Sequence, residues 1–274
     1  MKKFALIGKP LGHSKSANIH QAAYEQMDIQ ASYQSLETAE DQVKEIIDRI
    51  RADEISGLNV TIPHKVAVMA FLDEIDEDAK AIGAVNTIKK VGDRVIGYNT
   101  DAEGFKESLL DKLKTTSVKQ KKILVIGAGG AARAIVHVLA KDGALLSLTN
   151  RTHQKAETLA AMSPFDVNVI TKADAEKTLE QFDIVINTTS VGMSLAKQEL
   201  PLQLTFLHRE TLVCDLIYNP LETVLLKEAR LKGNKTLNGV GMLVNQAALA
   251  IELWTGEKPN RAIMEKTLLT EVKG

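Results

Sequence analysis

Short apolar runs alternate along this chain with longer stretches in which apolar residues recur every three or four positions. A short run rich in β-branched residues predicts a buried strand, and the longer spacing predicts an amphipathic helix. The first part of the chain predicts strands at residues 4–7, 32–36 and 57–61, and helices at residues 17–27, 43–50 and 63–72. An acidic helix start at 73–78, a hairpin that turns at 91–93 and a helix over 102–113 capped by Asp101 follow.

The alternation continues after a polar stretch at residues 112–122, which we interpret as a linker. Strands are predicted at 123–126, 145–148, 166–170, 182–187 and 212–216, and helices at 131–141, 154–162, 173–181 and 222–231. A long apolar helix over 239–254 and a final amphipathic helix end the chain. Strands that alternate with helices predict an α/β fold with a doubly wound parallel sheet in this part.

A glycine-rich loop lies between the strand at 123–126 and the helix at 131–141, and it reads Gly127-Ala128-Gly129-Gly130-Ala131-Ala132. This is the G-x-G-x-x-G/A pattern in the context that dinucleotide binding requires. Gly127 permits a tight turn, Gly129 lets a pyrophosphate approach the backbone, and Ala132 lets helix and strand pack closely. The N–H groups at the helix start then face the phosphates. We therefore predict a dinucleotide site that includes Ala128, Gly130 and Ala131.

The residues after the second strand of this unit indicate which dinucleotide is bound. An NAD site carries an acid there, which accepts a hydrogen bond from the ribose 2′-OH. This chain has Asn150-Arg151-Thr152, with Lys155 one turn later. Cations at these positions pair with a 2′-phosphate, which a carboxylate repels, so NADP is the predicted cofactor. Ligands bind at strand ends in such sheets, so we expect Thr188 and Leu216, together with Gly239, to border it.

Composition and charge exclude several classes of protein. At 274 residues with 45% hydrophobic content, the chain is long enough for two domains with real cores. Lys and Arg number 34 and Asp and Glu 35, so no net field favours nucleic acid or an anionic membrane. The lone cysteine, Cys214, allows no internal disulfide, and the apolar run at 4–7 is too short for a signal peptide. We expect a cytoplasmic protein, and no Cys/His cluster predicts a metal.

Two sets of candidate residues keep alternative interpretations at this point. Ser14 and Ser16 precede a helix, so they either cap it or bind a small carboxylate at its N-terminus. Lys65 falls in the first turn of the predicted helix at 63–72, where its charge opposes the helix dipole. A purely structural role is disfavoured there, and this position by itself favours a solvated surface lysine over a functional one.

Over nearly its whole length the sequence resembles the shikimate dehydrogenase family. The resemblance rests on several stretches that occur in the family's order and are far more specific than the glycine loop alone. They are GKPLGHSKS (8–16), GLNVTIPHK (57–65), GAVNT (83–87), GYNTDAEG (97–104), the glycine loop with NRT (150–152), YNP (218–220) and GVGMLVNQ (239–246).

The resemblance implies reversible NADP-dependent reduction of 3-dehydroshikimate to shikimate, on the pathway to aromatic amino acids. It implies a catalytic pair of Lys65 and Asp101, and a carboxylate site formed by Ser14, Ser16 and Tyr218. The residues around the substrate hydroxyls are then Asn59, Thr61, Lys65, Asn86, Thr100, Asp101 and Gln246. The implied architecture is a substrate domain (1–101 with 239–274) and a Rossmann domain (102–238) across a cleft, in a monomer or homodimer.

Other functions share some of these features. A quinate/shikimate dehydrogenase has the same catalytic pair but uses NAD as well, and the absence of an acid after Asn150-Arg151-Thr152 argues against it. The substrate motifs do not suit a folate, which argues against a methylenetetrahydrofolate dehydrogenase. A protein that senses NADP without turnover would not need Lys65 and Asp101. One departure from the family is Lys155, which replaces an arginine and loses a bidentate contact with phosphate.

Overall fold

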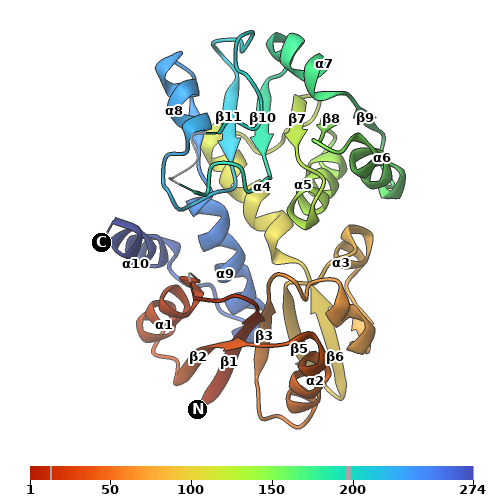
Figure 1. Cartoon of the computed structure of the whole chain (residues 1–274). Coiled ribbons are helices and arrows are strands. Elements are labelled where there is room, and N and C mark those ends of the chain that lie inside the picture. Colours follow the sequence, from red (N-terminus) through yellow and green to blue (C-terminus); the bar gives the residue numbers. More distant parts are fainter. Residues whose placement is uncertain (13, 195–198, 274) are drawn as a thin grey trace. The chain divides into compact units, whose positions relative to one another are not determined.

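The computed structural model describes residues 1–12, 14–194 and 199–273, and His13 of the first motif lies outside them. The chain forms two compact units, Met1–Gly104 with Val244–Gly274 and Phe105–Leu243, and Figure 1 shows a sheet in each. Both sheets have six strands, which agrees with the predicted α/β class. Within the described ranges, no helix is both long and apolar enough to cross a membrane.

The first unit contains a mixed sheet with the strand order β2-β1-β3-β5-β6-β4. β1 pairs in parallel with β2 and with β3, while β5 and β6 form the antiparallel hairpin that the sequence predicts. The bounds are Lys2–Gly8 (β1), Ala31–Glu37 (β2), Gly57–Val60 (β3), Glu74–Ile75 (β4), Thr87–Val91 (β5) and Arg94–Tyr98 (β6). The ends of β3 and β6 carry the segments that hold Lys65 and Asp101.

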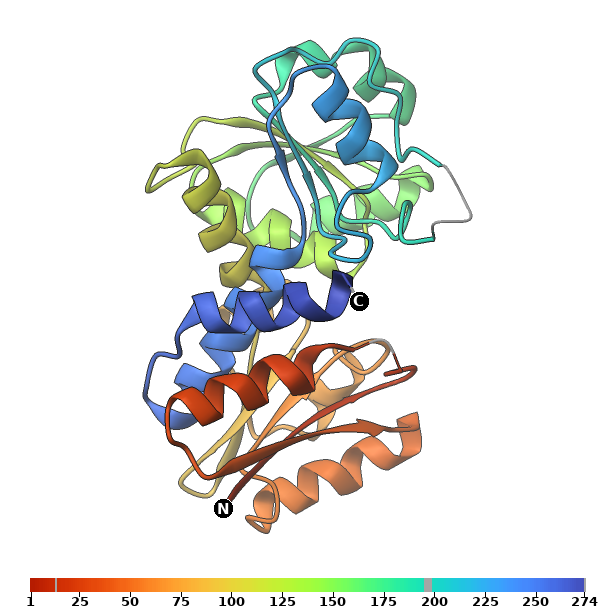
Figure 2. The ribbon, with the colours of Figure 1, turned by 90° about the vertical axis from the view of Figure 1, so that its left-hand side faces the viewer.

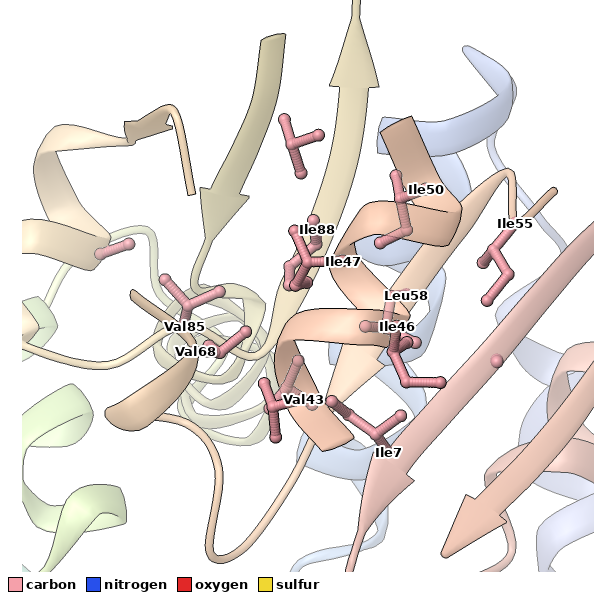
Figure 3. Packing of buried hydrophobic residues seen from close by; sticks show 14 residues of the cluster. Ile7, Val43, Ile46, Ile47, Ile50, Ile55, Leu58, Val68, Val85 and Ile88 are labelled. Carbon is pink, nitrogen blue, oxygen red and sulfur yellow. The ribbon is translucent and has the colours of Figure 1, made fainter. Parts of the chain in front are cut away.

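Helix α2 (Val43–Arg51) covers one face of this sheet, and its apolar stripe is the predicted one. Figure 3 shows the side chains of this stripe directed toward residues of the strands, among them Ile7, Leu58 and Ile88. Each fully buried isoleucine contributes about 1.5–3 kcal/mol through the hydrophobic effect. The stripe, all of it buried, consists of Val43, Ile46, Ile47 and Ile50.

Helices α1 (Ser16–Gln26) and α10 (Arg261–Lys273) lie side by side in the same unit, as Figure 2 shows. α1 carries His20, whose ring stacks on that of Tyr33 in β2, with centroids 4.1 Å apart. Burial lowers the pKa of His20 to about 3, so this ring is neutral inside the core. Together with Phe4, these rings form an aromatic layer on the unit.

Trp254 belongs to this aromatic layer rather than to an exposed surface. It lies near the end of α9 (Val240–Thr255), its ring stacks on Phe4 with centroids 4.6 Å apart, and only 7% of it is exposed. Its indole N–H donates to the Ile88 carbonyl at 2.9 Å.

The predicted α-helix over residues 63–72 does not form. Residues 62–66 form turns, and only Ala67–Phe71 is helical, as a 3₁₀-helix. In an α-helix the Lys65 carbonyl would accept from the N–H of Met69. Here it accepts from the Val85 N–H at 2.8 Å, while the Met69 N–H bonds to Val66. A tertiary hydrogen bond therefore prevents the α-helical ladder, and the argument that Lys65 opposes a helix dipole does not apply.

Only the last part of the acidic stretch at 73–78 begins a helix. Glu74–Ile75 pairs with β6 as the edge strand β4, and helix α3 begins at Glu77 and ends at Ile82. The cap of α3 is Asp76, whose carboxylate accepts from the N–H groups of Asp78 and Ala79 at 3.0 and 3.4 Å.

The second unit has a sheet in the order β12-β11-β10-β7-β8-β9, with every strand parallel to its neighbours. This confirms the predicted doubly wound sheet. The two-residue strand β12 was not predicted, because it is too short to show a pattern. The strands are Lys122–Ile126 (β7), Leu145–Thr149 (β8), Val167–Val169 (β9), Ile184–Asn187 (β10), Leu212–Asp215 (β11) and Thr236–Leu237 (β12).

The helices of this unit lie close to their predicted positions. The predicted helix over 173–181 is divided into α7 and a 3₁₀ turn at Leu179–Gln181, and α7 and α8 pack on one face of the sheet. The bounds are Gly130–Lys141 (α5), His153–Met162 (α6), Lys172–Lys177 (α7) and Val224–Leu231 (α8), and α4 (Thr100–Leu113) begins in the first unit and ends in this one.

The polar stretch at 112–122 is not a free linker. α4 extends to Leu113, and the loop that follows is bonded to the turn between α5 and β8. The Val118 N–H donates to Asp142 Oδ2 at 2.6 Å, and the Gln120 N–H donates to the Gly143 carbonyl at 2.9 Å. This loop is therefore an integral part of the second unit.

Candidate active site

Lys65 and Asp101 form an ion pair in the first unit. Lys65 Nζ lies 2.6 Å from Asp101 Oδ2, and 26% and 15% of the two side chains are exposed. Lys65 lies in the turn after β3, and Asp101 lies in the first turn of α4. The sequence motifs that carry these residues are far apart along the chain, and the fold brings their charged groups into direct contact.

The cap of α4 is Asn99 and not Asp101 as the sequence predicted. Asn99 Oδ1 accepts from the N–H groups of Asp101 and Ala102 at 3.1 and 3.3 Å. An asparagine accepts these bonds as well as an aspartate does. The carboxylate of Asp101 is thereby available to Lys65, because the helix start is already satisfied.

The turn that carries Lys65 is fixed on both sides. His64 is 1% exposed, and its Nε2 lies 2.8 Å from the Thr38 carbonyl, so this nitrogen carries the proton. The Lys65 carbonyl accepts from Val85. These bonds hold the backbone of residues 64–65, and the flexible lysine side chain extends from a fixed base.

A buried network of amides and hydroxyls lies next to this pair. Asn86 Nδ2 donates to Thr100 Oγ1 at 3.0 Å, and Asn86 Oδ1 accepts from the Thr100 N–H at 2.8 Å. Asn59 Nδ2 donates to Thr87 Oγ1 at 3.0 Å, and Asn59 Oδ1 accepts from the Tyr33 hydroxyl at 2.8 Å. Asn59, Asn86 and Thr100 were predicted from the sequence as substrate residues, whereas Thr87 and Tyr33 were not. Thr87 is the last residue of the GAVNT motif at 83–87.

Ser14 and Ser16 differ in their surroundings. The N-cap position of α1 is Lys15, which makes no side-chain cap. Ser14 Oγ accepts from the Ser16 N–H at 3.3 Å and thereby satisfies one amide of the first turn. No protein partner for the Ser16 hydroxyl occurs among the described residues. Lys15 pairs with Glu271 of α10 at 3.4 Å, which fastens the loop between the serines.

Thr61 and Gln246 complete the set of predicted substrate residues in this unit. The Thr61 N–H donates to the Ile7 carbonyl at 2.9 Å, which fixes the residue at the end of β3 beside β1. Gln246 lies on α9 and is 9% exposed. A Cβ at Gly104 would lie 2.7 Å from the Gln246 backbone nitrogen, so α4 and α9 approach closely there.

The glycine loop of the second unit has the geometry of a phosphate cradle. Gly127 has φ +115°, and a Cβ there would lie 2.4 Å from Thr188 Oγ1, so only glycine fits. Thr188 is held in place by its bond to the Ile126 carbonyl at 2.8 Å. At Gly129 and Gly130 a Cβ would meet nothing within 4 Å, and no side chain caps α5. Open space above uncapped amides at a helix start suits a dinucleotide phosphate.

The basic residues after β8 are available to an anion. Asn150 Nδ2 donates to the Thr152 carbonyl at 2.8 Å, which shapes the turn into α6. Arg151 and Lys155 are both exposed, and neither pairs with an acid among the described residues. Two such cations at the start of one helix fit the 2′-phosphate of NADP.

Tyr218 belongs to the second unit, whereas the other predicted substrate residues belong to the first. It is half-buried, and desolvation raises the pKa of its hydroxyl. The backbone of Gly239 contacts the segment that carries Tyr218, because the Gly239 N–H donates to the Ile217 carbonyl at 3.0 Å. A Cβ at Gly239 would lie 2.0 Å from the Leu216 oxygen, so these segments require a glycine.

A parallel sheet with an open glycine loop, together with a half-buried lysine–aspartate pair, defines the class as an NADP-dependent oxidoreductase of the Rossmann type. Three family models match the chain. They are the shikimate dehydrogenase substrate binding domain at residues 6–88, the shikimate / quinate 5-dehydrogenase at 109–218 and the shikimate 5′-dehydrogenase C-terminal domain at 239–269.

Individual relatives agree with these models. The chain is 50% identical to a shikimate dehydrogenase (NADP(+)) of Shouchella clausii over 97% of this chain and 98% of that protein. A crystal structure of a shikimate dehydrogenase with NADP+ has a TM-score of 0.92 at 41% identity, covering 99% and 96% of the chains. The Thermus thermophilus enzyme with NADP(H) and shikimate gives 0.88 at 36%, covering 98% and 99%. The chain belongs to the shikimate dehydrogenase family.

Proposed function

We propose that this protein catalyses the reversible NADPH-dependent reduction of 3-dehydroshikimate to shikimate. The observation that carries the proposal is the contact of 2.6 Å between Lys65 Nζ and Asp101 Oδ2 beside a network of buried amides. An ammonium held in this way suits a carbonyl oxygen that must gain a proton. Relatives over the full length of the chain carry the same activity in their names.

The protein's own part in the reaction is to manage charge and the proton. NADPH supplies the hydride to the C3 carbonyl carbon when it is bound. The ammonium of Lys65 stabilises the negative charge that develops on the oxygen and donates its proton there. Asp101 holds that ammonium in orientation until transfer, because its Oδ2 lies 2.6 Å from Lys65 Nζ. Oxidation of shikimate runs the same steps in reverse, with Lys65 as the base.

The hydroxyl groups and the carboxylate of the substrate require different kinds of side chain. Amides and hydroxyls both donate and accept, so they suit the hydroxyls of a polyol. Hydroxyls next to a helix N-terminus suit a carboxylate, and we assign Ser14 and Ser16 to this role. The family resemblance adds the hydroxyl of Tyr218. The residues that we assign to the hydroxyl groups are Asn59, Thr61, Lys65, Asn86, Thr100, Asp101 and Gln246.

The cofactor is assigned to the second unit. The loop Gly127-Ala128-Gly129-Gly130-Ala131 takes the pyrophosphate, and Asn150, Arg151, Thr152 and Lys155 take the adenosine side with its 2′-phosphate. Thr188, Leu216 and Gly239 border the remaining part. Thr188 and Leu216 directly follow strands β10 and β11, and the Gly239 N–H donates to the carbonyl of Ile217, the residue after Leu216.

We propose that residues 1–101 with 239–274 form the substrate-binding domain and that residues 102–238 form the NADP-binding domain. Only these small molecules are assigned as partners, since the balanced charge gives no field for nucleic acid. We propose a monomer or homodimer in the cytoplasm. A reducing compartment fits a protein whose single cysteine, Cys214, is buried and unpaired.

Shikimate oxidation by the purified protein tests the proposal directly. The rate is measured with NADP+ and with NAD+, and quinate replaces shikimate as the control substrate. We expect turnover of shikimate with NADP+ at much lower cofactor concentration than with NAD+, and little turnover of quinate. Equal rates for quinate and shikimate would instead identify a quinate/shikimate dehydrogenase. Binding of NADP+ without turnover of shikimate would indicate a protein that senses the cofactor.

A further inference from the structure

Asp215 is a buried carboxylate at the carboxyl edge of the parallel sheet. It is the last residue of β11, pairs in register with Asn187 at the end of β10, and is 1% exposed. Ligands of doubly wound sheets bind along this edge. A buried carboxylate is costly unless hydrogen bonds compensate its lost hydration. Its bonding partners therefore indicate why it is there.

Asp215 accepts hydrogen bonds from different segments of this edge. Its Oδ1 accepts from Asn187 Nδ2 and from the Ile217 N–H, each at 3.1 Å. Its Oδ2 accepts from the Thr223 hydroxyl at 2.7 Å. Both oxygens are thus occupied by protein donors, and the carboxylate joins the end of β10 to the segment after β11 and to the N-cap of α8.

These partners lead to the residues that we assign to ligand binding. Asn187 Oδ1 accepts from the Thr189 N–H at 3.1 Å and from its hydroxyl at 2.7 Å, which orders the loop that begins with Thr188. The loop returns at Gly192, where a Cβ would lie 3.3 Å from Thr223. On the other side, Ile217 lies between Leu216 and Tyr218, and its carbonyl accepts from Gly239.

We infer that Asp215 is a positioning residue for the NADP site and for Tyr218. Its carboxylate holds the loop at residues 187–192 and the segment at 216–218 in one arrangement, and Gly239 docks on that arrangement. Asp215 itself contacts neither cofactor nor substrate in this role. The inference rests on the proposed function, because it is the ligand assignments of Thr188, Leu216, Tyr218 and Gly239 that give the arrangement its purpose.

The chemistry of the network predicts how substitutions differ. Asp215→Ala removes these acceptors and leaves the Ile217 N–H and the donor of the Thr223 hydroxyl buried without partners. Asn187 Nδ2 then keeps only its bond to the Val191 carbonyl at 3.3 Å. Asp215→Asn keeps an oxygen for Asn187 and Ile217, and its amide donates to the Thr223 hydroxyl, which rotates to accept. If Asp215 acts by position, Asn therefore rescues the loss. If its negative charge were the active feature, Asn would be as harmful as Ala.

The test measures NADP+ affinity by direct binding and the KM of shikimate by turnover. We expect Asp215→Ala to weaken both by about tenfold, because small displacements of ligand groups are costly, and Asp215→Asn to stay within about twofold of the unaltered protein. Asp142→Ala is the matched control, since Asp142 accepts from the Val118 N–H at 2.6 Å and the Ser117 hydroxyl at 2.9 Å, away from this edge. It should lower thermal stability without changing either affinity.

Unchanged affinities in folded Asp215→Ala would overturn the inference, as would equal losses in Asp142→Ala or Asp215→Asn. If Asp215→Ala does not fold, Thr223→Val removes the hydroxyl bond to Asp215 together with the cap that the same oxygen makes with the Leu226 N–H. It should weaken NADP+ binding about threefold, with Thr223→Ser, which keeps both bonds, as the conservative rescue. Normal affinity in Thr223→Val then contradicts the inference. If the unaltered protein binds NADP+ but does not oxidise shikimate, the proposed function fails, and the binding measurements still decide the role of Asp215.

Discussion

Asn99 and Asp101 lie two residues apart at the start of α4, and their side chains bind different partners. Asn99 Oδ1 accepts from the Asp101 N–H at 3.1 Å, while the Asp101 carboxylate lies 2.6 Å from Lys65 Nζ. The side chain of Asn99 satisfies the backbone of α4, and that of Asp101 serves the ion pair. The placement of the candidate catalytic pair thus depends on a cap made by its neighbour.

Lys65→Ala should reduce kcat by about 10²–10⁴-fold, the usual range for a lost general acid. Affinities for shikimate and NADP+ should change far less, because the serines and the glycine loop remain. Asp101→Asn should also be slow but add little to the Lys65→Ala defect, since residues that act as a unit are not additive. Steady-state kinetics of both single variants and the double variant measure this. A Lys65→Ala protein with near-normal kcat and a raised KM would make Lys65 a substrate ligand only.

Asn99→Ala should lower both stability and activity. Loss of the cap should reduce the free energy of unfolding by about 1 kcal/mol, and the loosened helix start should reduce kcat through Asp101. Asp76→Ala is the matched control, because Asp76 caps α3 of the same unit through the N–H groups of Asp78 and Ala79. It should lose similar stability, measured by urea unfolding, and keep its kcat. If the two variants had equal kcat, the cap made by Asn99 would not influence the ion pair of Asp101 with Lys65, and the prediction would be wrong.

Arg151→Ala should raise the KM for NADP+ strongly and leave that for NAD+ nearly unchanged, because only NADP+ carries the 2′-phosphate. Arg209 provides the control, since it is exposed and pairs with Glu210 at 3.5 Å. Arg209→Ala should leave both constants unchanged. Equal losses with both cofactors in Arg151→Ala would contradict the assignment to the phosphate.

Ser14 and Ser16 should respond differently to alanine. Replacing both should weaken substrate binding by about 2 kcal/mol if they hold the carboxylate. Thermal stability should fall mainly with Ser14→Ala, because Ser14 Oγ already accepts from the Ser16 N–H. KM values and melting temperatures of the single variants check this. A melting temperature that falls while substrate affinity stays normal would favour helix capping as their role.

The stability of the protein should depend on pH through Asp215. Burial raises its pKa to about 6 from the ordinary 3.8, although its hydrogen bonds with Thr223, Ile217 and Asn187 oppose the rise. Between about pH 4 and 6 the folded protein therefore binds more protons at this carboxyl than the unfolded chain. The contribution of Asp215 is fully present below pH 4 and declines by about 3 kcal/mol as the pH rises through 6.

Urea unfolding of the unaltered protein and of Asp215→Asn at several pH values measures this contribution. The stability of the unaltered protein relative to the variant should fall as the pH rises, since asparagine does not titrate. A constant difference from pH 4 to pH 7 would show that Asp215 has an ordinary pKa.

The sequence by itself determined the features that depend on neighbours along the chain. The glycine loop, the buried stripe of α2 and the basic residues after β8 were all predicted, because a strand–turn–helix or an apolar spacing of three and four is a local pattern. The resemblance of the motifs then identified Lys65 and Asp101 as a pair that local patterns alone do not connect.

The tertiary structure decided whatever depends on residues distant in sequence. Lys65 lies in a turn and not in an α-helix because Val85 takes its carbonyl. Asp101 pairs with Lys65, which belongs to a distant motif, because Asn99 already caps α4. The bonds of Asp215 join the ends of separate strands, and no spacing along the chain reveals them. Hydrogen bonds between distant segments compete with local preference, and the folded arrangement determines which bond forms.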